Sequence, residues 1–284
     1  MRANVKYRVI HRFKGKYNVR DMCAFFGVSR SGYYAWMKKA DKEDPDKLIG
    51  ELIQKCQKKT RKTYGYRRVQ IWLLREYGLV MNHKAVLRIM NKYNLLSKSR
   101  RRRKWVQNNE SVHKYTNLLE RNFHTERPNL KWCTDISYIP TKEGFVYLSV
   151  IKDLYDNFVV AYKIGTENNN NLVYETLKAE KREVTAELQL HSDQGFQYTS
   201  DGYFKLTQSY HITPSMSSRG NPYDNAMAEN FFSILKTECI YRTKLKTYEE
   251  ARLLIDEYIH FYNNERIQLK TKLTPLEKRC QFVA

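Results

Sequence analysis

Residues 131–153, KWCTDISYIPTKEGFVYLSVIKD, are the stretch that decides the fold. The segments 131–139 and 145–153 are rich in β-branched and aromatic residues, and the polar TKEGF between them is typical of a hairpin turn. Residues 157–164, NFVVAYKI, have the same texture and predict a third strand. Asp135 interrupts the first of these apolar strands, where a charge is costly unless it has a partner such as a metal ion.

Helices and strands alternate after this triple of strands. We expect a helix near 168–183, a short strand at 188–193, a helix near 200–209, a short strand at 211–216 and a long helix from about 223 to 242. Three antiparallel strands followed by alternating helix and strand is a mixed α/β order. The sequence therefore predicts an RNase H-like α/β core over residues 129–245, followed by a C-terminal helical extension over 246–284.

Two more acidic residues occupy informative places in this order. Asp193 ends the fourth strand, at the edge where open α/β sheets bind ligands, and Glu229 lies one to two turns into the last helix, on the face that carries Lys236. Acids converging from two strands and a helix would form an oxygen-lined site suited to Mg²⁺, although each alone could cap a turn or carry surface charge. Of the rival acids, we assign Asp153 to strand-end structure and Asp224 to a helix N-cap.

Residues beside the acids have candidate supporting roles. Gly195 would let the loop after the fourth strand turn sharply. His191 and Gln194 could orient a carboxylate or contact DNA, and packing or capping is an equal alternative for each. Asn225 could hold the preceding SRGNP loop by hydrogen bonds.

Charge is distributed very unevenly along the 284 residues. The chain holds 51 Lys and Arg against 30 Asp and Glu, for a net charge of +21. Residues 1–110 contain 29 basic and 8 acidic side chains, whereas residues 111–284 contain 22 of each. This asymmetry predicts a basic nucleic-acid-binding region joined to a neutral domain with another task, the alternative being a solvated basic surface without function.

The first part of the basic region has the pattern of a helix-turn-helix. Residues 18–39 contain an apolar helical stretch, a turn at Gly27, and a second helix with Ser29 as N-cap and Arg30 in its first turn, where side chains reach bases or phosphates. We expect residues 1–45 to form an N-terminal helix-turn-helix. An ordinary helical hairpin would show the same spacing.

A second helical DNA-binding unit is expected over residues 46–97. Its helices are predicted at about 46–60, 65–77 and 82–94, each with an apolar and a basic face. The candidate phosphate contacts are Arg67, Arg68, Lys84 and Arg88.

A basic linker, residues 98–128, follows. It opens on KSRRRRK, with five consecutive basic residues that resist packing: Arg100, Arg101, Arg102, Arg103 and Lys104. We expect these side chains to grip phosphates, and a solvated linker is the alternative.

Composition excludes several classes of protein. The mean hydropathy is −0.72, no apolar stretch approaches the ~18 residues of a membrane span, and the N-terminal residues lack the apolar centre of a signal peptide. The five cysteines form no CxxC pair, so we expect reduced thiols and no zinc ribbon.

Three motifs carry a resemblance to a known family. TDISYIP around Asp135, HSDQGFQY around Asp193 and SRGNPYDNAMAENFFSILKTE around Glu229 resemble the three catalytic signatures of transposases of the insertion-sequence-three (IS-three) family, relatives of retroviral integrases. The 35 residues between the last two acids match the family's interval, and Lys236 matches its basic residue seven positions after the glutamate. YGYRRV near the second unit and YNNERIQLKTKLTP near the C-terminus extend the likeness, while Gln268 stands where many members carry His.

The resemblance implies a DDE-type transposase with a retroviral integrase-like core, which catalyses metal-dependent strand cleavage and 3′-OH strand transfer. On the family's pattern, Asp135, Asp193 and Glu229 would hold two Mg²⁺ ions, with Mn²⁺ also accepted. The expected partners are the DNA of the element's ends and of the target, a first-frame protein or fusion, and further copies of the chain, with no membrane. The chain resembles the second-frame (OrfB-type) product, and its expected location is the bacterial cytoplasm, at the nucleoid.

Two other functions remain open at this stage. One is a helix-turn-helix regulator with an inactive core, and the other is an RNase H-like nuclease. A metal-dependent nicking assay on DNA and on an RNA–DNA hybrid separates the three.

Overall fold

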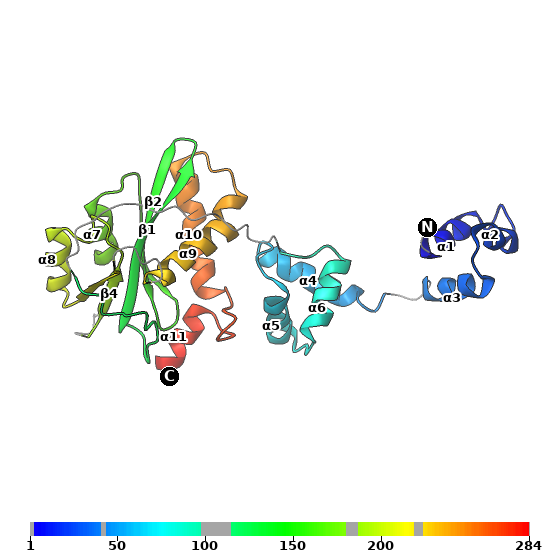
Figure 1. Cartoon of the computed structure of the whole chain (residues 1–284), viewed down its shortest axis with the longest axis horizontal. Helices are drawn as coiled ribbons and strands as arrows, with labels where there is room; N and C mark the ends of the chain where they lie inside the picture. The colour runs from blue at the N-terminus through cyan, green and yellow to red at the C-terminus, as the bar shows by residue number, and fades with distance from the viewer. Residues whose placement is uncertain (1–2, 41–43, 98–114, 180–186, 219–223, 284) are drawn as a thin grey trace. The chain divides into compact units, whose positions relative to one another are not determined.

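The computed structural model describes residues 3–40, 44–97, 115–179, 187–218 and 224–283. The chain divides into two units, Met1–Ser97 and Lys98–Ala284, which are coloured blue to cyan and green to red in Figure 1. All five cysteines are free thiols. Within the stretches that the structure describes, every helix is too short or too polar to cross a lipid bilayer.

The first three helices surround a small apolar cluster. They are α1 (Ala3–Phe13), α2 (Val19–Phe26) and α3 (Arg30–Ala40). The predicted turn is confirmed, because α2 ends at Gly27 in the left-handed region (φ +60°) and the Ser29 hydroxyl accepts a hydrogen bond from the Gly32 amide at the start of α3. The sequence analysis missed α1, whose one buried side chain, Ile10, packs with Met22 and Tyr33.

Three more helices complete the first unit, close to their predicted positions. They are α4 (Lys47–Lys59), α5 (Tyr66–Tyr77) and α6 (His83–Lys92). Each buries one apolar stripe, and α6 begins where the Asn82 side chain accepts a hydrogen bond from the Lys84 amide. The buried Gln57 amide donates to the carbonyls of Tyr64 and Leu95, which ties α4 to the segments that flank α5 and α6.

A five-stranded sheet organises the second unit. The strands are β1 (Lys131–Thr141), β2 (Gly144–Asp153), β3 (Val159–Gly165), β4 (Gln189–Ser192) and β5 (Thr213–Met216). Their order is β3-β2-β1-β4-β5, with β1, β2 and β3 antiparallel and β4 and β5 parallel to β1. This is the RNase H-like arrangement that the sequence predicted.

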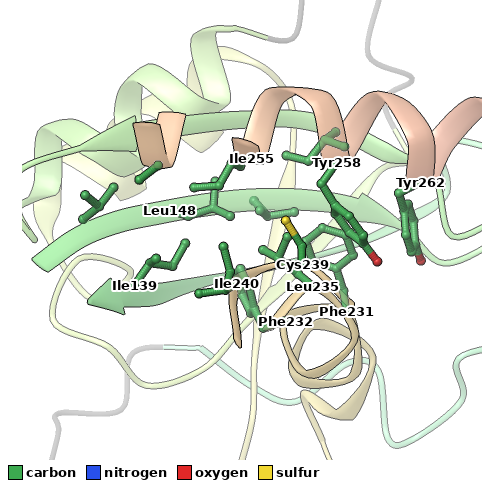
Figure 2. Close-up of a cluster of buried hydrophobic side chains, with 14 of the residues drawn as sticks. Ile139, Leu148, Phe231, Phe232, Leu235, Cys239, Ile240, Ile255, Tyr258 and Tyr262 are labelled. Carbon is green, nitrogen blue, oxygen red and sulfur yellow. The ribbon is translucent and has the colours of Figure 1, made fainter. Parts of the chain in front are cut away.

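Helices cover both faces of this sheet, as Figure 1 shows. They are α7 (Asn170–Lys178), α8 (Asp201–Ser209), α9 (Ala226–Glu238) and α10 (Tyr248–Asn264), joined by the short helix η1 (Ile240–Arg242) and followed by α11 (Pro275–Val283). Side chains of α9 and α10 interlock with Ile139 and Leu148 of the sheet in one core (Figure 2). The other core forms where α7 and α8 meet Trp132 and Ile151.

The C-terminal part of the chain is built into the second unit. The predicted helix over 223–242 is shorter than expected: α9 starts at Ala226 and stops at Cys239, whose backbone leaves helical geometry. The chain then turns through η1, so that Ile255 and Tyr258 of α10 reach the same core as α9. Farther on, Arg279 of α11 forms buried ion pairs with Asp153, the last residue of β2, and with Asp156.

Candidate active site

The first two acids stand side by side because of the parallel pairing of β1 and β4. The pairing joins Cys133 to His191, so Asp135 and Asp193 each lie two residues beyond the same rung. The backbone holds both carboxylates: Asp135 Oδ1 accepts a hydrogen bond from the Ile136 amide at 2.8 Å, and Asp193 Oδ1 accepts one from the Gly195 amide at 2.9 Å. The sheet register therefore brings these two acids to one edge.

Gly195 is required because a side chain at this position would crowd its neighbours, and not because its backbone takes an unusual angle. A Cβ at this position would lie 3.0 Å from Asp193 Oδ1 and 3.1 Å from Gln197 Oε1. The glycine thus permits the tight contact between its own amide and the carboxylate, which refines the predicted role in turning the loop.

The third acid, Glu229, lies in the first turn of α9 and is exposed. Two contacts fix the start of this helix against the sheet. The side-chain amide of Asn225 donates to the backbone carbonyl of Thr134, one residue before Asp135, at 3.3 Å. The buried Lys152 ammonium donates to the Met227 carbonyl at 3.0 Å. Asn225 therefore contacts β1. The sequence analysis expected it to hold the SRGNP loop instead, and most of that loop lies outside the described residues.

The electrostatics connect the three acids. Burial, followed by the charge of Asp193 and then that of Glu229, raises the pKa of Asp135 well above its usual range. Burial also raises the pKa of Asp193, and burial together with the charge of Asp193 raises that of Glu229. Each carboxylate therefore gains from a nearby cation.

The donor chemistry of this site fits a divalent metal ion, because three carboxylates supply hard oxygen ligands and surplus negative charge. In the part of the chain that the structure describes, no group of three or more His, Cys, Asp or Glu side chains is arranged to hold a metal ion.

Lys236 lies at the border of the site, two turns along α9 from Glu229. Its ammonium is 4.9 Å from the centre of the Tyr138 ring, and its positive charge lowers the pKa of Asp135. The sequence analysis singled out Lys236 and missed Tyr138. The signal for Tyr138 was an aromatic residue three positions after Asp135 in the same strand.

Two supporting residues have partners near β5. His191 is buried, with Nδ1 2.9 Å from the Ser215 hydroxyl and Nε2 3.1 Å from the Ser217 hydroxyl, and burial lowers its pKa to about 4. It joins β4 to β5 and the following residues, which corresponds to the packing role that the sequence analysis gave as an equal alternative. The Gln194 amide donates to the Ser217 carbonyl at 3.0 Å.

The two rival acids have structural partners. Asp153 is buried against Arg279 at 2.6 Å, in agreement with its assignment to strand-end structure. Asp224 does not cap α9, which corrects the prediction. It is buried instead and accepts hydrogen bonds from Asn117, Arg121 and the Ser218 amide, thereby joining the segment before the sheet to the start of α9.

The predicted DNA-binding residues of the first unit differ in their surroundings. Arg30, Arg67 and Lys84 are exposed, whereas Arg68 is half-buried with its guanidinium over the Tyr64 ring. Arg88 is not a simple surface cation, because it binds both oxygens of Asp46 at 2.7 Å. The run Arg100, Arg101, Arg102, Arg103 and Lys104 lies outside the described residues.

The RNase H-like sheet, with acids on the first strand, after the fourth strand and on the helix that follows the fifth strand, defines the class of DDE-type polynucleotidyl transferases. The sequence matches the integrase core domain over residues 125–222, a second integrase core domain family over 229–282 and an HTH-like domain over 43–103.

Curated relatives specify the family. The chain is 34% identical to the "Putative transposase InsK for insertion sequence element IS150" of Escherichia coli, over 96% of this chain and 98% of the relative. It is 29% identical to the transposase InsF for insertion sequence IS3A of Escherichia coli, over 92% and 93%. A structural likeness with a TM-score of 0.45 and 16% identity is found to the HTLV-2 integrase catalytic core domain, over 55% of this chain and 99% of that one. The chain belongs to the IS-three family of transposases, and is a DNA-binding enzyme.

Proposed function

We propose that Asp135, Asp193 and Glu229 are the catalytic residues of this transposase and that they bind two Mg²⁺ ions, for which Mn²⁺ can substitute. The observation that carries the proposal is the sheet register that sets Asp135 beside Asp193, together with the raised pKa values of the three acids. Burial raises all three values, and the charge of Asp193 raises those of Asp135 and Glu229 further. Such a group of oxygen donors is suited to a hard divalent cation, whose charge offsets that of the carboxylates.

The reactions are cleavage of the DNA strand at the element's end, which leaves a free 3′-OH, and transfer of that 3′-OH to target DNA. When bound, the ions supply the Lewis acidity that activates the attacking oxygen and stabilises the leaving one. The protein fixes the carboxylates through the amides of Ile136 and Gly195, and it fixes the start of α9 through Asn225. Lys236 can place a phosphate beside the acids, because an ammonium binds phosphate and repels a metal ion.

We assign DNA recognition to the basic parts of the chain. In this proposal, residues 1–45 and 46–97 are two helical DNA-binding units and residues 98–128 are a basic linker. Arg30, Arg67, Arg68 and Lys84, together with the run 100–104, contact phosphates, while Arg88 can do so only by leaving Asp46. The core then occupies 129–245, with the helical extension 246–284 completing its apolar packing.

The working assembly follows from the reaction. Joining two element ends to one target requires more than one active site, so we propose that several copies of the chain act together on DNA. A first-frame protein, separate or fused, would supply end recognition. The place of action in this proposal is the bacterial cytoplasm, at the nucleoid.

A substitution at Glu229 tests the catalytic assignment. Glu229→Gln preserves size and helix formation but removes an anionic metal ligand, so cleavage and strand transfer should both be lost while DNA binding is retained. The assay uses Mg²⁺, the element's own ends and an RNA–DNA hybrid of the same sequence, with the first-frame protein supplied. Glu249→Gln, at a 66% exposed side chain on α10, is the matched control and should act like the wild type. Cleavage at the wild-type rate by Glu229→Gln would remove Glu229 from the site.

A further inference from the structure

An exposed pair of aromatic rings lies on the hairpin that carries Asp135. Tyr138 is 60% exposed and Phe145 is 55% exposed, and their rings meet edge to face with centroids 5.6 Å apart. The register pairs Ile139 with Val146, and these two side chains point into the core shared with α9 and α10, where Figure 2 shows Ile139. Because neighbouring residues of a strand point to opposite faces, Tyr138 and Phe145 lie on the other face of the hairpin, at an end where both rings are exposed.

Lys236 links this aromatic pair to the acids. Tyr138 follows Asp135 by three residues of strand, a rise of about 10 Å, and points to the opposite face of the strand, because successive side chains alternate between the two faces. Lys236 follows Glu229 by seven residues of helix, again about 10 Å. The Lys236 ammonium lies 4.9 Å from the Tyr138 ring centre, so the strand and the helix that carry two of the acids meet again at this ring.

The combination of groups indicates what the surface binds. An exposed ring offers a flat surface to a nucleobase, and base–aromatic stacking is tolerant of sequence. The adjacent ammonium offers a charge to the phosphate on the same strand. A protein partner with an acidic surface would use the lysine but has no need of the flat ring, so the observations favour DNA.

We propose that Tyr138, supported by Phe145, stacks against an unpaired base next to the scissile phosphate, while Lys236 holds the neighbouring phosphate. The inference rests on the proposed function, since it takes the acids as the place where the phosphate is cut. Tyr138 is then a positioning residue that keeps the end of the DNA strand open and aligned with the acids.

A fluorescent base tests the stacking directly. The probe is a duplex with the element's terminal sequence, in which the two nucleotides beside the scissile phosphate are unpaired and one of them is 2-aminopurine. In EDTA, where no cleavage occurs, binding of the full-length wild type and of Tyr138→Phe should quench its emission. Tyr138→Leu, which keeps an apolar side chain but has no ring, should bind without quenching. Phe204→Leu, at a 46% exposed ring on α8, is the matched control and should quench like the wild type.

The cleavage assay in Mg²⁺ gives a second readout. On a fully paired end, Tyr138→Leu should cut roughly ten- to a hundredfold more slowly than the wild type, the rate expected when one base stack is lost. On an end that lacks this base altogether, the two proteins should cut equally fast. Wild-type quenching by Tyr138→Leu overturns the stacking proposal whatever its cleavage rate. Sedimentation of the protein without DNA identifies the alternative. If Tyr138→Leu quenches normally but sediments more slowly because it self-associates less, the rings join copies of the chain, and the stacking proposal is again overturned.

Asp135→Asn separates this inference from the proposed function. It should quench the probe normally and cut nothing. If Asp135→Asn cuts at the wild-type rate, the assignment of the acids fails while the stacking result still stands on the fluorescence of Tyr138→Leu.

Discussion

At Asp135, the charged form of a single side chain is costly to the folded protein. Burial and the charges of Asp193 and Glu229 raise its pKa, so the folded state holds a proton more tightly than the unfolded chain does. A raised carboxyl pKa means that stability falls as the pH rises from the ordinary Asp range, about 4, towards the raised value. At neutral pH, the site is therefore a source of instability that a cation relieves.

Metal addition should therefore stabilise the protein, and the effect should depend on Asp135. We expect Mg²⁺ at a hundred times its dissociation constant to add about 2.7 kcal/mol to the free energy of unfolding, with a higher Tm. In EDTA, Asp135→Asn should melt above the wild type, and it should gain far less from Mg²⁺. Differential scanning calorimetry measures both effects, with Glu249→Gln as a control that should follow the wild type. An equal gain from Mg²⁺ in Asp135→Asn would argue that the ion binds elsewhere.

His191 predicts a pH dependence of the opposite sign. Burial lowers its pKa from 6.5 to about 4, so between these pH values the imidazole is protonated in the unfolded chain and neutral in the folded protein. Stability is complete above the unfolded value and falls as the pH drops from 6.5 towards 4. Between pH 7 and pH 5, we expect a loss on the order of 2 kcal/mol from this residue, measured by urea unfolding without added metal.

His191→Gln provides the comparison for this effect. The amide can still exchange hydrogen bonds with Ser215 and Ser217 but cannot take up a proton, so its stability should change less between the two pH values. A loss equal to that of the wild type would assign the pH dependence to other groups.

Single residues show where sequence reasoning succeeds. Asp135 could be recognised because an acid inside an apolar strand needs a reason to be there. The partners of His191 and Asp224 could not be predicted, because Ser215, Ser217 and Asn117 are distant in sequence and only the sheet brings them close. Tyr138 escaped notice because outward positions of a strand accept almost any residue.

Among the elements, the strands were the most predictable. The alternation and the turn in residues 131–153 specify the hairpin of β1 and β2 within one or two residues at each end. The helix α1 was missed because most of its residues are polar or basic and its burial depends on α2 and α3. The end of α9 at Cys239 carries no glycine or proline signal, and the packing of α10 against the sheet is what explains the turn there.

The helix α6 gives a prediction at this scale. Asp46, just before α4, accepts hydrogen bonds from Arg88 and Lys92 of α6, which hold its carboxyl pKa well below the usual range. Asp46→Asn should release Arg88, while Lys92 keeps its ion pair with Asp44 at 2.6 Å. The affinity for duplex DNA should therefore rise, and its salt dependence should steepen by about one phosphate contact. The Tm of the protein should fall, because an ion pair that joins two helices is lost.

A matched substitution separates local release from net charge. Glu51→Gln, at an exposed residue of α4, removes the same charge without touching Arg88. Fluorescence anisotropy with a duplex at several salt concentrations compares the two variants. If both variants raise the affinity for DNA equally, the ion pair with Asp46 does not keep Arg88 from binding phosphate.

Over the whole molecule, charge and chemistry are separated along the chain. All of the excess positive charge lies in residues 1–110, and the three acids lie in the neutral remainder. The boundary between the two units, at Ser97, falls near this change in charge. Composition could predict such a division because it needs only counting, whereas the placement of the site needed long-range strand pairing.

The separation predicts how the two parts bind DNA. A fragment of residues 1–110, with its net charge of +21, should bind duplex DNA with an affinity that falls steeply as salt rises, since each neutralised phosphate contributes about −0.9 to the slope of log K against log salt. The fragment 111–284 has no excess charge and should bind the same duplex weakly, with a shallow slope.

The stacking proposed at Tyr138 changes this little, because a paired duplex offers no free base. An end with unpaired bases should recover part of the binding of fragment 111–284, and that gain should persist at high salt because stacking releases few counterions. Anisotropy titrations of both fragments with a paired and an unpaired end measure all four slopes. Equal affinities of the two fragments for the duplex would contradict the assignment of DNA binding to the basic region.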